Sequence, residues 1–186
     1  DPAGRTTKIV LYADDITQRK LKQIDYEWQI NAIHKSNIAV TFDTYGTILD
    51  ANDLFLKATG YQLDDVVGNH HRIFVESTHA HGSNYATFWS DLRSGKHRVG
   101  TYRRKRSDGS PIWLQATYNP IFDASGNVMK IVKYASEVTA ERLIQADHQG
   151  QIAAIHSVQC VASFDLQGNL IDANENFLSA TGYKLA

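Results

Sequence analysis

Histidines form the densest group of chemically versatile side chains in this sequence. His70, His71, His79 and His81 fall within twelve positions, just before a predicted helix that begins at Ser83. A neutral imidazole is a good ligand for haem iron. Zinc also binds imidazole, but no nearby cluster of cysteines or carboxylates supplies its remaining ligands. Histidines in a polar segment before a helix are also common as surface or capping groups, so both interpretations stay open.

A second group of interest is a basic run made of Arg98 and residues 103–106. Alternation along a strand divides such residues between the two faces of a sheet, which favours a solvated hairpin over a nucleic-acid site. The sequence contains no nucleophile elbow, phosphate-binding loop or zinc-protease helix. The adjacent Asp64 and Asp65 point to different faces, so they are poor acid and base partners. We therefore expect no enzymatic activity in this segment.

Composition places the chain among ordinary globular proteins. It has 186 residues, 42% of them apolar, and a formal net charge of -1. Near-neutral charge disfavours nucleic acid and membrane surfaces as partners. The single cysteine, Cys160, cannot form an internal disulfide, and no apolar run reaches the roughly 18 residues of a membrane span. We expect a cytoplasmic segment, without membrane contact, that is a fragment of a longer protein.

An internal repeat sets the expected domain boundaries. Residues 29–64 and 151–186 are identical at 18 of 36 positions without a gap, at an offset of 122. The offset is too long for a solenoid repeat, so each unit is a whole domain. We predict five segments: the tail of a preceding unit at 1–17, a linker helix at 18–36, a complete domain at 37–139, a linker helix at 140–157, and the first part of a following unit at 158–186.

Periodicity and turn residues indicate the elements of the complete unit. Strands are expected at 38–42, 47–49, 98–106, 112–122 and 128–137, with short helices between the second and third strands. Gly46 is expected to take a positive φ, Asn52 to cap a helix that Gly60 ends, and Thr17 and Ser83 to cap two others. Pro120 is expected to bend or finish the long central strand. The fold class is α+β, a five-stranded antiparallel sheet with helices on one face and flanking linker helices.

This order of elements resembles the PAS domain, a sensory module common in bacterial signalling proteins. The resemblance covers the whole unit and rests on motifs in a fixed order: Phe42-Asp43, Asp50-Ala51-Asn52, Thr59-Gly60-Tyr61, His70-His71-Arg72, Phe88-Trp89, the segment 113–120, and Glu137-Val138-Thr139. The His-His-Arg turn and the Tyr-Asn-Pro strand are most similar to PAS units linked to chemoreceptors, including tandem receptors that govern biofilm dispersal. Flavin-binding aerotaxis receptors are more distant relatives.

The resemblance implies a pocket between the sheet and the helices. Haem-binding PAS domains supply their iron ligand from the region of the four clustered histidines, and His81 is the preferred candidate because it lies nearest the Ser83 helix. Flavin (FAD) ranks below haem, because flavin-binding relatives carry a tryptophan where this sequence has Arg98, two residues before Gly100. Neither cofactor is required. Further candidate pocket residues are Trp89, Trp113, Tyr118 and Asn119, although a buried tryptophan is also a common core residue.

These observations predict a sensory PAS module that binds a small molecule or cofactor. A change in the pocket would pass through the final strand, Glu137 and Thr139 to the outgoing helix, where Thr139 is expected to be the N-cap. The alternative is a cofactor-free PAS module for dimerisation and relay. Expected partners are a second copy of the chain, neighbouring PAS units and a downstream signalling domain.

Overall fold

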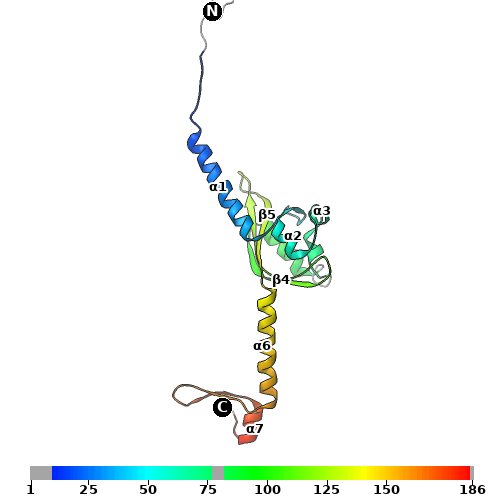
Figure 1. Ribbon diagram of the computed structural model, residues 1–186, viewed down its shortest axis with the longest axis vertical. Helices are drawn as coiled ribbons and strands as arrows, with labels where there is room; N and C mark the ends of the chain where they lie inside the picture. Colours follow the sequence, from blue (N-terminus) through cyan, green and yellow to red (C-terminus); the bar gives the residue numbers. More distant parts are fainter. Residues whose placement is uncertain (1–9, 77–81, 185–186) are drawn as a thin grey trace, which may run out of the picture.

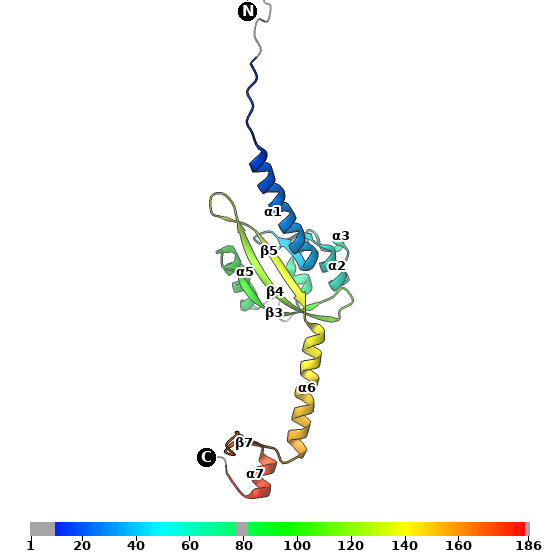
Figure 2. The ribbon, with the colours of Figure 1, turned by 60° about the vertical axis from the view of Figure 1, so that its left-hand side comes forward.

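The structure is a computed structural model that describes residues 10–76 and 82–184. Its centre is an α+β domain between Ile38 and Glu137, preceded by helix α1 (Thr17–Ser36) and followed by helix α6 (Thr139–Val158). Figures 1 and 2 show the two helices leaving the domain at opposite ends. Within the described ranges, no helix combines the length and apolarity needed to cross a membrane.

The predicted five-stranded antiparallel sheet is confirmed. Its strand order is β2-β1-β5-β4-β3, so the last strand of the domain lies between the first strand and β4. The observed bounds differ from the predicted ones by at most two residues: β1 (Ile38–Phe42), β2 (Ile48–Ala51), β3 (Arg98–Lys105), β4 (Pro111–Phe122) and β5 (Val128–Glu137).

Short helices cover one face of this sheet, as expected. They are α2 (Asp53–Thr59), α3 (Leu63–Val66), the 3-10 helix η1 (His71–Phe74) and α5 (Ser83–Arg93). Alternate strand residues such as Val40, Leu114 and Ile131 face them and pack against Phe55 and Leu92, all almost fully buried. Each such side chain contributes roughly 1.5–3 kcal/mol by leaving water. The core therefore lies between the sheet and the helices.

Asn52 fixes the entry to this helical layer. Its Oδ1 accepts hydrogen bonds from the backbone N–H groups of Phe55 and Ala39, both at 3.0 Å. Its Nδ2 donates to the carbonyl oxygens of His34 and Asn37, both at 2.7 Å. One side chain thus caps α2 as predicted and also ties the end of α1 to strand β1.

Four expectations about helix ends and strand ends were wrong in detail. Thr17 and Ser83 are the first residues of their helices, and the caps are Ile16 and Gly82, without side-chain hydrogen bonds. Thr139 likewise follows its cap, Val138. Pro120 lies inside β4 and pairs with Ile131. It is tolerated there because the pairing of β4 with β3 stops at Tyr118, leaving β4 with one neighbour.

The repeated sequence adopts the same local structure twice. Beyond α6, strands β6 (Ala162–Phe164) and β7 (Leu170–Ala173) form a hairpin followed by helix α7 (Glu175–Thr181). Asn174 makes the four hydrogen bonds that correspond to those of Asn52, including 2.7 Å to the carbonyl oxygen of His156. None of the residues of these three elements is buried.

The two asparagines form a natural matched pair for a stability test. Asn52→Ala removes four hydrogen bonds beside a packed core and should lower the free energy of unfolding by about 2–4 kcal/mol. Asn174→Ala removes the same bonds where no core exists, and should leave the main transition unchanged. Urea unfolding followed by circular dichroism measures both. Equal losses in the two variants would contradict this assignment.

Candidate functional site

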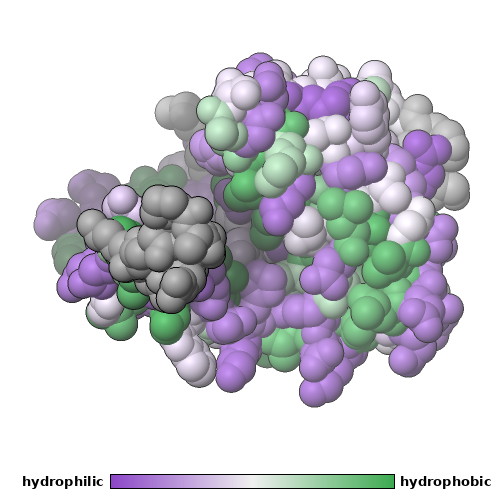
Figure 3. Space-filling model, turned by 90° about the horizontal axis from the view of Figure 1, so that it is seen from above, coloured by the Kyte–Doolittle hydropathy of each residue, from purple (hydrophilic) through white to green (hydrophobic). Residues whose placement is uncertain are grey.

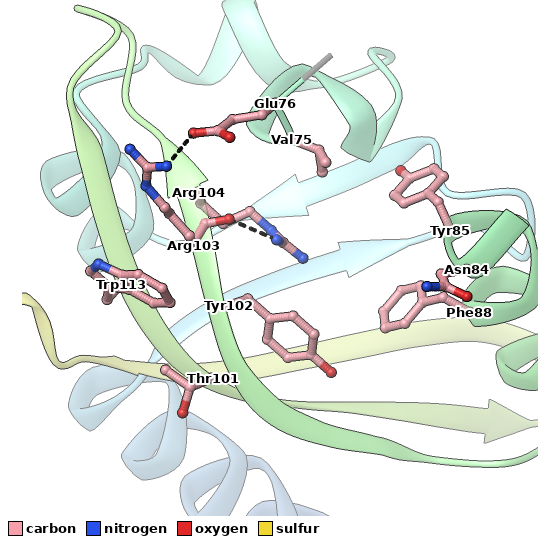
Figure 4. Close-up of a pocket in the computed structure, with 10 residues that line it drawn as sticks. All are labelled: Val75, Glu76, Asn84, Tyr85, Phe88, Thr101, Tyr102, Arg103, Arg104 and Trp113. Atoms are coloured by element: carbon pink, nitrogen blue, oxygen red, sulfur yellow. Dashed lines mark hydrogen bonds and ion pairs between the residues drawn. The ribbon is translucent and has the colours of Figure 1, made fainter. Parts of the chain in front are cut away.

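A cavity of about 410 Å³ opens between β3 and the start of α5. Aromatic rings dominate its walls, and two arginines reach it from β3, as Figure 4 shows. The Arg103 guanidinium forms an ion pair with Glu76 at 2.9 Å. The volume of the cavity is in the range of binding sites for small organic ligands. The lining residues are Val75, Glu76, Asn84, Tyr85, Phe88, Thr101, Tyr102, Arg103, Arg104 and Trp113.

His71 lies behind this cavity, in the interior of the domain. It is fully buried, with Nδ1 2.9 Å from the Tyr85 hydroxyl and Nε2 3.1 Å from the Tyr118 hydroxyl. Burial, followed by the nearby positive charges of Arg104 and Lys133, holds the pKa of His71 well below its usual value. The imidazole is therefore neutral at pH 7, and each ring nitrogen already has a hydroxyl partner.

Lys133 is a buried lysine in the same interior of the domain. It lies on β5 opposite Tyr118 of β4, is only 2% exposed, and holds its Nζ 5.4 Å from the centre of the Tyr118 ring. Burial lowers the pKa of Lys133, an effect that Tyr118 partly opposes. Burial raises the pKa of Tyr118, but Lys133 and Arg104 outweigh it and the net shift is downward. Among the described residues, no carboxylate forms an ion pair with Lys133.

Lys133 was not among the predicted site residues. A usable signal existed, because strict alternation along β5 puts position 133 on the same face as the buried Ile131 and Ala135. A lysine in that phase departs from the apolar pattern and marks a site that requires an explanation. The predicted set of site residues also lacks four residues of the cavity wall, because each fits an ordinary amphipathic pattern: Tyr85, Phe88, Tyr102 and Arg104.

Trp113 connects the cavity to the outgoing helix. Its side chain lines the cavity, while its backbone N–H donates to Thr139 Oγ1 at 3.0 Å and its carbonyl accepts from Val138 N–H at 2.8 Å. The Arg142 guanidinium lies 4.8 Å from the centre of the Trp113 ring. Thr139 thus anchors the start of α6 to β4 instead of capping the helix. Beside it, Glu137 pairs with Arg106 at 2.7 Å.

The other predicted site residues are distributed as follows. Trp89 is a core residue in contact with Phe42 and His71, and Tyr118 lies one ring layer behind the cavity. Asn119 donates to Thr117 Oγ1 at 3.1 Å, away from the cavity lining. His70 caps η1, where its Nδ1 accepts from the Arg72 N–H at 3.1 Å. His79 and His81 lie outside the described residues.

These positions bear on which cofactor the site suits. Of the described histidines none lines the cavity, and using His71 as an iron ligand would break one of its two tyrosine hydrogen bonds. Among the described residues, the cavity therefore has no histidine that could serve as a haem iron ligand. Arg98, where flavin-binding relatives carry a tryptophan, forms an ion pair with Asp91. No group of three or more potential metal ligands occurs in the described part of the chain.

Fold and site together define an α+β module with a cavity at one side of the sheet and helices at both ends. Residues 48–135 match the family model described as the PAS fold. The domain is a PAS domain of the chemoreceptor-linked type, as the sequence motifs predicted.

Two curated proteins and one solved structure show the range of similarity. The biofilm dispersion protein BdlA of Pseudomonas aeruginosa is 40% identical over 154 residues, covering 82% of this chain and 36% of that protein. The aerotaxis receptor of Escherichia coli K12 is 25% identical over 103 residues, covering 55% of this chain and 20% of the receptor. A solved light-oxygen-voltage domain studied with a flavin analogue superimposes with a TM-score of 0.52 at 23% identity, covering 69% of this chain and 98% of that domain. The chain thus spans about a third of the first relative's length.

The neutral state of His71 predicts a pH dependence of stability. The unfolded chain takes up a proton near the ordinary value of 6.5, whereas the folded chain does not. Stability from this group is therefore present above pH 6.5 and is lost as the pH falls, by up to about 1.4 kcal/mol per pH unit. His71→Asn should weaken this dependence between pH 6.5 and 5, measured by urea unfolding.

His148→Asn is the matched control for this experiment, because His148 is exposed on α6. It should keep the wild-type slope. Identical slopes for wild type and His71→Asn would show that the buried imidazole is not the group that titrates on unfolding.

Proposed function

We propose that this PAS domain senses a small molecule and relays its presence to α6 through Trp113. The observation that carries the proposal is that one residue both lines the cavity and holds the start of α6 by its backbone N–H and C=O. In a parent protein of the chemoreceptor type, α6 would pass the signal to neighbouring PAS units and a downstream signalling domain, in the cytoplasm. Its role is sensory, without catalysis.

The physical requirement for such a relay is modest. A ligand that favours one position of the Trp113 side chain over another by roughly 1–3 kcal/mol shifts the junction between its two arrangements by about 5- to 150-fold. Two hydrogen bonds, the contact with Arg142 and the neighbouring Glu137–Arg106 ion pair are the interactions that such a shift can alter. In this proposal Glu137 and Thr139 carry the signal, with Thr139 acting through its hydrogen bond to Trp113 and not as a helix cap.

Haem, flavin and no cofactor remain distinguishable alternatives for what the domain binds. Our ranking of haem above flavin has no support from the described residues, so the proposal names a small organic molecule and leaves both cofactors as outcomes. The visible absorption spectrum of freshly purified protein separates them. A Soret band would favour haem, flavin bands would favour flavin, and neither would leave a colourless ligand or the cofactor-free relay.

The junction yields a direct prediction. Thr139→Ala removes the acceptor of the Trp113 N–H and should destabilise the junction by about 0.5–1.5 kcal/mol. Spin labels on the only native cysteine, the exposed Cys160, and on Ala124→Cys in the β4–β5 turn report how α6 lies relative to the sheet. Thr139→Ala should broaden or shift the distance distribution between the two labels.

Thr87→Ala, the same change at an exposed position of α5, should leave that distribution as in the wild type. The relay through Trp113 is wrong if Thr139→Ala and Thr87→Ala give the same distribution while both proteins remain folded.

We further propose that the chain forms homodimers. Phe164 and Ile171, in the β6–β7 hairpin of the second copy, are 55% and 63% exposed. Figure 3 shows hydrophobic residues exposed in several separate patches on the face seen from above. A hairpin and one helix cannot bury enough apolar surface to offset their ordering entropy, so a second molecule is their natural cover.

Light scattering tests this proposal. The 186-residue chain should be a dimer, and Phe164→Ser combined with Ile171→Ser should shift it towards monomer. A fragment of residues 18–143 shows whether the linker helices dimerise without the second copy. Monomers of the full chain would overturn the dimer.

A further inference from the structure

The interior behind the cavity holds more positive charge than the described residues neutralise. Lys133 is almost fully buried, and Arg104 reaches the cavity from β3. Neither forms an ion pair with a described carboxylate, because Glu76 pairs with Arg103 and Asp91 pairs with Lys96 and Arg98. The neighbouring His71 is neutral and contributes no negative charge.

Arg104 is the member of this group that a ligand can reach. Its guanidinium lies 4.8 Å from the centre of the Tyr102 ring, and its Nη1 donates to the Arg103 carbonyl oxygen at 2.8 Å. Its Nε is buried with no hydrogen-bond partner in the described part of the chain. Figure 4 shows the guanidinium projecting into the space between Arg103, Val75 and the rings on α5. One buried donor of Arg104 therefore has no partner among the described residues.

Lys133 adds a second positive charge behind the cavity wall. Phe88 and Tyr102 of the cavity wall contact the Tyr118 ring at centroid distances of 4.9 and 5.5 Å, and Lys133 lies over that ring. Charges in such an interior are screened far less than in water. A lysine held there without an anion destabilises the fold, so an anion bound at Arg104 would lower that cost.

The first turn of α5 also favours a negatively charged ligand. Asn84 and Tyr85 of that turn line the cavity, and the turn contains no acidic residue. The positive end of the helix dipole is thus turned towards the cavity without a side-chain anion to complement it.

We propose that the cavity binds an aromatic carboxylate, with its carboxylate on Arg104 and its flat body between Tyr102, Phe88 and Tyr85. A guanidinium matches a carboxylate through two parallel hydrogen bonds, and the ring-lined walls suit a planar apolar body. The inference rests on the proposed sensory function and specifies its ligand class. A guanidinium pairs with carboxylates and with phosphates, so a phosphate analogue is one of the probes in the test.

Isothermal titration calorimetry of the 186-residue chain with 2-naphthoate tests the proposal. Its neutral isostere 2-naphthamide and the dianion 2-naphthyl phosphate are the comparison probes. The wild type should bind 2-naphthoate about 10- to 100-fold more tightly than 2-naphthamide, since a charge-assisted hydrogen bond distinguishes them. Equal affinities, no binding of 2-naphthoate at millimolar concentration, or tighter binding of the phosphate would each overturn it.

Variants then locate the anion. Arg104→Gln should abolish the preference for 2-naphthoate over 2-naphthamide, whereas Lys105→Gln, which removes the same charge from an exposed position of β3, should preserve it. Lys133→Met should weaken binding of 2-naphthoate more than binding of 2-naphthamide. Arg104→Met, which keeps an unbranched stem over Tyr102, replaces Arg104→Gln if that protein unfolds. Retained preference in the Arg104 variant would refute the site.

Failure of this proposal is separable from failure of the sensory function. The effect of Thr139→Ala on the distance between the labels is measured without ligand, so it reports the Trp113 junction alone. An intact junction with no carboxylate preference would reject the ligand class and leave the relay standing.

Discussion

The buried hydrogen bond between His71 and Tyr118 is the constraint on which the rest of the domain depends. It joins the helical layer to strand β4 at 3.1 Å, where water has no access. A neutral imidazole has one donor and one acceptor nitrogen, and Tyr85 and Tyr118 supply hydroxyls that can serve both. Losing either partner would leave a buried polar group unsatisfied, at a cost of about 1–3 kcal/mol. The three side chains therefore fix η1, α5 and β4 relative to one another.

That constraint also shapes the cavity. Because Tyr118 is held from behind by His71, its ring gives Phe88 and Tyr102 a fixed surface, and these two rings form the cavity wall. Lys133 lies over the same ring, and its charge adds to burial and to the charge of Arg104 in lowering the pKa of His71. The interior thus combines packed aromatic rings with an excess of positive charge. Hydrophobic periodicity predicts buried rings but does not predict a buried charge among them.

Sequence patterns located the elements well because local rules decide them. Gly46 and Gly60 have φ values of 94° and 75°, and Asn52 caps α2, since few other residues satisfy those positions. The local roles predicted for Thr139 and Pro120 were wrong because both depend on tertiary contacts. The Thr139 hydroxyl accepts a hydrogen bond from the Trp113 N–H and so does not cap α6. Pro120 lies beyond the last residue of β4 that pairs with β3, so no hydrogen bond to β3 is lost there. Lys133 departs from the apolar alternation of β5, but its surroundings could not be predicted because Tyr118 and Arg104, which act on it, are distant in sequence.

The linker helix is held at both ends by groups that belong to different copies of the repeat. At its start, Trp113 of the complete domain binds Val138 and Thr139. At its end, Asn174 of the second copy binds the carbonyl oxygens of His156 and Gln159 at 2.7 and 2.6 Å, just as Asn52 binds the end of α1. A 20-residue helix is a rod of about 30 Å. Because each end is anchored to a strand through hydrogen bonds, a displacement at Trp113 has to be absorbed either by loss of an anchor or by movement of the next copy's first strand. The repeat therefore places a mechanical connection between the exit of one unit and the entry of the next.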